Sequence, residues 1–110
     1  MNLDHFEEGI RLFNRRAFFE AHEALEDVWR AAPEPEKKFL QGLIQVAVAL
    51  HHYGNGNLVG ARSLMSRASR NLSAYPKQYA GIDLQRLRHT LGRWECALAE
   101  SAPAPEPPTL

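Results

Sequence analysis

A histidine, a glutamate and a tryptophan stand in the stretch EAHEALEDVWR, residues 20–30, at the spacing of one helix face. At about 100° of rotation per residue, Glu26 lies about 40° and Trp29 about 20° from His22. An imidazole and a carboxylate four residues apart on a helix can supply two ligands to one divalent ion. We therefore predict His22 and Glu26 as metal ligands, with zinc, iron or manganese as the candidate ion.

Two ligands hold a divalent ion weakly, so a third and a fourth ligand must come from elsewhere. If the chain reverses about residue 34, Gln45 is the polar residue best placed to meet His22. His52 shares a helix face with Gln45 but lies about two turns, on the order of 9 Å, from the level of His22. The predicted ligand-binding residues are Trp29 as a wall, Gln45 and Glu23, and the predicted third metal ligand is His52.

Two glycines are expected to flank this region. When residues are counted equally in both directions from each turn, Gly9 of the first helix lies opposite His22, and Gly42 of the third helix lies beside Glu26. Because glycine costs a helix about 1 kcal/mol relative to alanine, the pair indicates close helix approach or a small cavity.

A structural role for the same residues stays open. Glu26 can pair with Arg30, an i,i+4 ion pair worth about 0.3–0.5 kcal/mol when exposed. Alternatively, His22 and Glu26 hydrogen-bond to each other beneath Trp29 and satisfy their polar groups without a ligand. The second class of function is then a non-catalytic helical interaction module, in which this pair is a polar staple.

The site interpretation is favoured because an inward Glu26 carries a burial cost that solvent-facing Glu20 and Asp27 do not. A metal with an open coordination position would support metal-assisted hydrolysis. The sequence has no serine–histidine–acid motif, phosphate-binding glycine loop or CxxC, so no other chemistry is indicated and enzymatic activity stays open.

Helical periodicity positions these residues and runs through most of the chain. The expected helices are about 3–13, 17–32, 36–53, from 58 to before Tyr75, and 84–98, with the third one central. Asn57 and Asp83 have the side chains that cap a helix start. No strand-like alternation is present. The prediction is an all-α, single-domain bundle of about five antiparallel helices over residues 1–100.

The stretch SAPAPEPPTL, residues 101–110, has four prolines in ten residues and no apolar stripe to bury. This composition is typical of a disordered segment, so we predict a mobile proline-rich C-terminal tail.

Composition and charge narrow the function classes. The 110 residues suit one domain, and the single cysteine, Cys96, cannot form an internal disulfide. Early acidic residues argue against a signal peptide, and no apolar stretch is long enough to cross a bilayer. A soluble, cytoplasmic protein with no membrane partner is expected.

The net charge is zero but unevenly distributed. Residues 1–36 hold nine acids against four arginines, whereas residues 60–99 hold seven bases against two acids. Solvated helix faces explain this pattern, and pairing of acidic with basic faces in a homo-oligomer is the alternative. Because no nucleic-acid-binding signature accompanies the bases, a nucleic acid partner is disfavoured.

Two segments, FNRRAFFEAHEALEDVWR and FLQGLIQVAVALHHYGNGNLVGARSL, resemble the bacterial and archaeal family called Domain of Unknown Function 309. The family hallmark, HxxxExxW or HxxxExxY, is matched here by His22, Glu26 and Trp29. The resemblance covers roughly residues 5–95. It implies a small all-helical fold and a motif proposed to bind metal, and it brings no established activity.

Overall fold

Five helices and one short hairpin follow one another in the computed structural model, which describes residues 1–110. The elements are α1 (Leu3–Asn14), α2 (Phe18–Ala31), α3 (Glu34–Gly54), α4 (Leu58–Leu72), β1 (Gln78–Tyr79), β2 (Ile82–Asp83) and α5 (Leu84–Ala99). The predicted all-α fold of five helices is confirmed, and each predicted helix end that was given a residue number lies within about two residues of the observed one.

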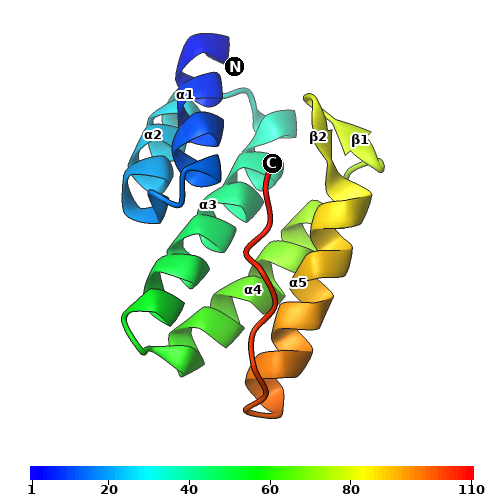
Figure 1. The fold of residues 1–110 in the computed structure, drawn as a ribbon. Coiled ribbons are helices and arrows are strands. Elements are labelled where there is room, and N and C mark those ends of the chain that lie inside the picture. Colours follow the sequence, from blue (N-terminus) through cyan, green and yellow to red (C-terminus); the bar gives the residue numbers. More distant parts are fainter.

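The helices form two antiparallel hairpins and a fifth helix (Figure 1). α1 packs on α2, α2 on α3, α3 on α4, and α4 on α5, so each helix contacts its neighbours in sequence. α3 is the longest helix and buries eight residues between α2 and α4, which confirms its central position. None of the helices has the combination of length and apolar character that a membrane crossing requires.

Local signals fix the helix starts. The Asn57 side chain accepts a hydrogen bond from Gly60 N at 2.9 Å, and Asp83 accepts one from Arg86 N at 3.0 Å, which confirms both predicted caps. α3 begins at Glu34, two residues earlier than expected, and Pro35 stands in its first turn. Backbone N–H groups in the first turn have no partner within the helix, so proline, which lacks this group, loses no hydrogen bond there.

Both flanking glycines mark close approach between helices. A Cβ atom at Gly9 would lie 2.7 Å from Leu25 Cδ2, and one at Gly42 would lie 2.7 Å from Leu72 Cγ. The predicted close approach is therefore confirmed. The placement of Gly42 beside Glu26 is wrong, because this glycine faces α4. Counting residues from a turn estimates the position along the helix axis, but it does not show which face a helix turns to its partner.

The β1–β2 hairpin was not predicted. Its strands pair Gln78 with Asp83 and Tyr79 with Ile82. The two turn residues, Ala80 and Gly81, both have positive φ, at 51° and 78°, which is the conformation of a tight hairpin turn. Strands of two residues are too short to show alternation, so the sequence pattern carries no signal for them.

The proline-rich segment, for which the sequence predicts a mobile tail, makes hydrogen bonds to distant residues of the helical domain. Residues 102–110 run extended from the end of α5 back towards α1 (Figure 1). Asn14 Nδ2 donates to the carbonyl of Leu110 at 3.1 Å, and Leu110 N donates to Asn14 Oδ1 at 2.7 Å. Arg16 Nη1 donates to the Pro108 carbonyl at 3.1 Å, and Pro108 is buried. Since these partners lie more than 90 residues away in sequence, no local pattern reveals them.

Deleting residues 102–110 is expected to lower the free energy of unfolding by about 1–2 kcal/mol, because several hydrogen bonds of about 1 kcal/mol each are only partly offset by released chain entropy. For a domain of this size the melting temperature falls by about 5 °C or more. Thermal denaturation of the parent and the deletion variant measures the change. Equal melting temperatures would instead support a mobile tail.

Candidate functional site

The motif histidine is held in one orientation by its own helix. His22 Nδ1 lies 2.8 Å from the carbonyl oxygen of Phe19, one turn earlier in α2. Because a carbonyl oxygen only accepts, Nδ1 carries the proton, and in the neutral ring Nε2 keeps its lone pair. A backbone carbonyl on the other ring nitrogen is the support that metal-binding histidines use.

The free Nε2 atom of His22 faces the carboxylate of Glu26, with 3.7 Å between Nε2 and Oε2. Two ligand atoms that each lie about 2.1 Å from one ion are at most about 4.2 Å apart. The spacing of this pair is therefore compatible with two ligands of a single divalent ion.

Glu26 is less inward than the helical pattern predicts. Its side chain is 40% exposed, against 20% for His22, and its Oε2 also lies 3.7 Å from Arg30 Nη2. The argument from a buried carboxylate is therefore wrong, because a glutamate at the border of the apolar face has a side chain long enough to reach water. Glu26 therefore lies within ion-pair distance of both His22 and Arg30, but 3.7 Å is too long for the hydrogen bond between His22 and Glu26 that the sequence left open.

Trp29 joins the end of α2 to the start of α3. Lys37 Nζ donates to the Trp29 carbonyl at 2.6 Å and lies 4.3 Å from the centroid of the Trp29 ring. These contacts fix the turn between the two helices. The indole Nε1 of Trp29 is buried and has no hydrogen-bond partner.

The remaining predicted residues do not gather around His22. Gln45 Oε1 accepts a hydrogen bond from Asn71 Nδ2 at 2.9 Å and so links α3 to α4. Glu23 is exposed, and His52 is half-buried in the last turn of α3. No group of three or more His, Cys, Asp or Glu side chains that could hold a metal ion is present. Counting residues from the turn between α2 and α3 did not determine which face of α3 is turned to α2.

His51, not His52, is the histidine that comes towards α2. The Phe19 ring lies 5.1 Å from the His22 ring and 5.3 Å from the His51 ring, so this aromatic side chain stands next to both histidines. The sequence pattern singled out His52 and not His51. Adjacent helix residues point about 100° apart, and only the angle at which α3 crosses α2 decides between them.

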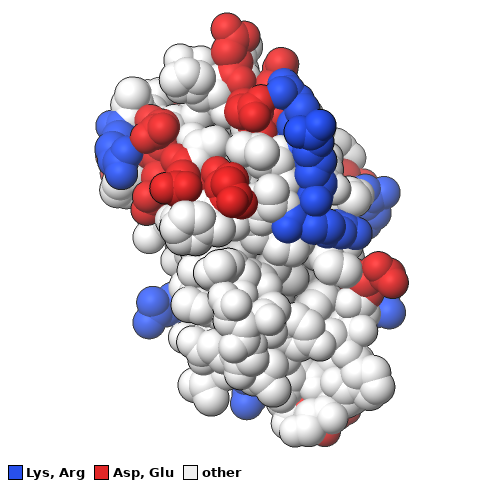
Figure 2. Space-filling view, turned by 60° about the vertical axis from the view of Figure 1, so that its left-hand side comes forward, with Lys and Arg blue, Asp and Glu red and all other residues white.

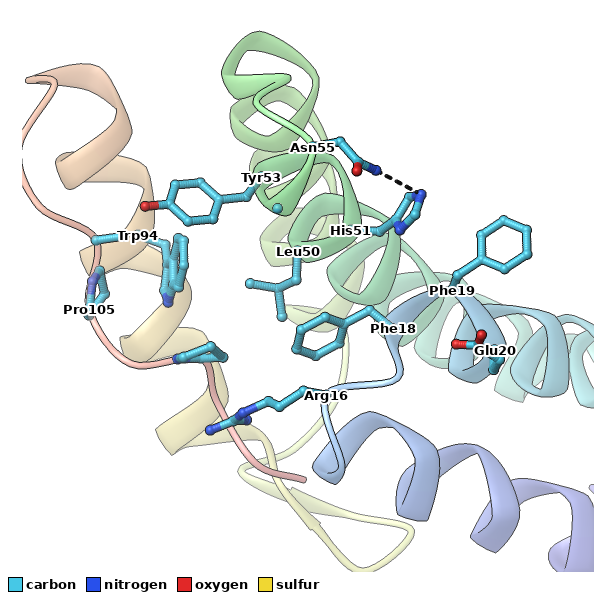
Figure 3. Close-up of a pocket in the computed structure, with 13 residues that line it drawn as sticks. Arg16, Phe18, Phe19, Glu20, Leu50, His51, Tyr53, Asn55, Trp94 and Pro105 are labelled. Carbon is cyan, nitrogen blue, oxygen red and sulfur yellow. Dashed lines mark hydrogen bonds between the residues drawn. The ribbon is translucent and has the colours of Figure 1, made fainter.

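A groove of about 650 Å³ opens beside Phe19 (Figure 3). We call it the aromatic groove. Its lining residues are Arg16, Phe18, Phe19, Glu20, Leu50, His51, Tyr53, Gly54, Asn55, Trp94, Ala104, Pro105 and Pro107. The groove thus lies between α3 and α5 and has residues of the proline-rich segment along one side.

Acidic side chains surround the motif. α2 carries Glu20, Glu23, Glu26 and Asp27 within eight residues, all of them exposed or half-buried. In Figure 2 most of the visible acidic groups lie in the upper half of the molecule, where α1 and α2 lie, with basic side chains beside them, and the lower half of that face has few charges. On α2 four acids stand against the single Arg30, and this excess of negative charge raises the local concentration of cations.

Together, the fold and the motif define a small all-helical domain with an imidazole–carboxylate pair on its second helix. The family model described as domain of unknown function (DUF309) matches residues 6–64, which include most of α1, all of α2 and α3, and the first half of α4. The chain belongs to this family, as its motif indicated.

Two uncharacterised proteins are similar to the chain. YpuF of Bacillus subtilis (strain 168) is 40% identical over 75 residues, which cover 66% of this chain and 43% of the relative. A protein of Aquifex aeolicus (strain VF5) is 35% identical over 77 residues, which cover 69% of this chain and 23% of the relative. The chain therefore spans less than half the length of each of these relatives.

Proposed function

We propose that His22 and Glu26 form a divalent-metal site on the surface of α2, open to a small polar ligand. The observation that carries this proposal is the orientation of His22: Nδ1 is bound to the Phe19 carbonyl, and the free Nε2 lies 3.7 Å from Glu26 Oε2. Imidazole with carboxylate suits zinc, iron and manganese. The acidic surface of α2 supports the proposal because it favours cations.

With two protein ligands, the other coordination positions belong to water or to a polar ligand. Such an ion supplies Lewis acidity and lowers the pKa of bound water, which makes metal-assisted hydrolysis the reaction class of this proposal. The chain's own part is to hold the His22 ring through Phe19 and to exchange the Arg30 contact of Glu26 for the ion.

Added zinc or manganese is expected to raise the melting temperature of the parent chain, and Glu26→Gln to abolish that rise. Stabilisation grows as RT ln(1 + [L]/Kd), or about 2.7 kcal/mol at a metal concentration of 100 Kd. With chelator, Glu26→Gln costs less than about 1 kcal/mol, because its ion pairs are largely solvated. Thermal melts with chelator and with each metal test both effects.

Glu20→Gln is the matched control, since it removes the same charge from an exposed position on the same helix. It is expected to keep the metal response. A parent chain that ignores every metal tried, together with a Glu26→Gln variant that is badly destabilised in chelator, would contradict the metal site.

That contrary result would favour the second candidate, a helical interaction module in which His22 and Glu26 are a structural pair. The observation in its favour is the exposed apolar start of α4, where Val59 is 82% exposed and adjoins Leu58. Exposed apolar side chains that form one patch are typical of surfaces that bind another protein, and Leu58 is itself 48% exposed.

A further inference from the structure

The aromatic groove holds part of the chain's own proline-rich segment by a main-chain contact. The indole Nε1 of Trp94 donates to the carbonyl of Glu106 at 3.3 Å, and Pro105 and Pro107 lie along the groove on either side of that residue. Tyr53 packs edge-on against the Trp94 ring, with the ring centroids 4.9 Å apart. This contact holds the indole in place on the wall of the groove.

The segment is built to lie in such a groove. Its prolines occur at residues 103, 105, 107 and 108. Each proline fixes its own φ and forces the preceding residue into an extended conformation, so the segment is already close to a polyproline helix before it binds. A segment of this kind loses little conformational entropy on docking.

The contacts recognise shape more than sequence. Trp94 and Arg16 both donate to main-chain carbonyls, of Glu106 and Pro108 respectively. Any extended, proline-rich segment presents the same carbonyls at the same spacing. An aromatic-lined groove with donors to those carbonyls is the general way in which proteins bind polyproline segments.

The groove also has room that the segment leaves open. A volume of about 650 Å³ remains beside residues 104–107, and its walls include Phe18 and Leu50 from α2 and α3 (Figure 3). The segment therefore lies along one side of the groove without filling it.

We propose that the aromatic groove is a binding site for an extended, proline-rich segment of another protein, and that residues 103–108 occupy it within the chain as a competing ligand. The competition is strong because a short tether gives the tail a local concentration of about millimolar or more. The partner segment binds where the tail lies, with Trp94 as its central donor.

The test uses the full-length chain with all four prolines of residues 103–108 replaced by serine, and a free peptide with the sequence of residues 101–110. The peptide is expected to shift the NMR signal of the Trp94 indole N–H and to bind this variant at least about tenfold more tightly than it binds the parent, whose own tail competes. A peptide with serine at the proline positions is the matched control and is expected not to bind.

Trp94→Phe, made in the serine variant, keeps an aromatic ring but removes the donor, and is expected to weaken peptide binding. If the serine variant does not fold, the full-length Pro105→Ser/Pro107→Ser variant replaces it, because it changes only the two prolines that line the groove and leaves every groove donor in place. No binding at millimolar peptide, or equal binding of the serine peptide, would overturn the proposal. So would a parent dimer that the serine variant loses, because the partner would then be a second copy of this chain.

Discussion

Replacing Phe39 by alanine is expected to cost about 3–5 kcal/mol of folding free energy, the usual range for a buried phenylalanine. The Phe39 side chain is fully buried, and its ring lies 6.0 Å from that of Phe6, 5.7 Å from Tyr75 and 4.8 Å from Tyr79. It therefore joins α1, α3 and the β1–β2 hairpin region. Since small domains have about 5–15 kcal/mol in total, urea unfolding should show a large loss.

Phe19→Ala serves as the comparison, because that phenylalanine is 47% exposed. Its loss is expected to be about 1 kcal/mol or less, in line with substitutions outside the core. Similar costs for the two substitutions would mean that the rings around Phe39 do not pack as described here.

Gly42→Val is expected to destabilise the chain by about 2–3 kcal/mol, because branched carbons are inserted where α3 and α4 already touch. The first added carbon alone would lie 2.7 Å from Leu72 Cγ, and Leu72 is fully buried. Either the leucine or the whole of α4 must move. Chemical denaturation of the variant and the parent measures the difference.

Gly92→Ala in α5 is the control substitution of a helical glycine, and it is expected to stabilise the chain. A Cβ atom there meets nothing within 4 Å, so only the helix preference of alanine acts, and a gain of about 0.5–1 kcal/mol is expected. Destabilisation at Gly92, or a neutral Gly42→Val, would contradict the helix packing described here.

Features set by local chemistry could be predicted from the sequence. The helices, the caps at Asn57 and Asp83, and the tight contact at Gly9 follow from periodicity, hydrogen-bonding side chains and the absence of a Cβ atom. Each of these signals lies within a few residues of its effect. The family could also be recognised from the sequence, because the motif residues His22, Glu26 and Trp29 stand close together in the chain.

The surroundings of the motif could not be predicted in the same way. His22 and Glu26 do lie within reach of each other, as their i,i+4 spacing requires. Whether Gln45 turned to α2 or to α4, and whether His51 or His52 approached Phe19, depended on the rotation and crossing of α3. A helical wheel holds no information on either quantity.

The proline-rich segment shows a different limit. Its composition is typical of disorder because it has too few apolar groups to form a core of its own. Proline nevertheless packs well against aromatic rings, and Trp94 supplies one together with a donor. Composition describes what a segment can do alone, whereas its docking depends on a surface built elsewhere.

The order of helix contacts has a consequence for how the chain folds. Because α1 to α5 contact mainly their neighbours in sequence, most tertiary contacts close short loops, which favours rapid folding. The hydrogen bonds between Asn14 and Leu110 join residues 96 positions apart and can form only after the helices on both sides are in place. We therefore expect docking of the tail to be a late step of folding, and its hydrogen bonds link the end of the chain to α1.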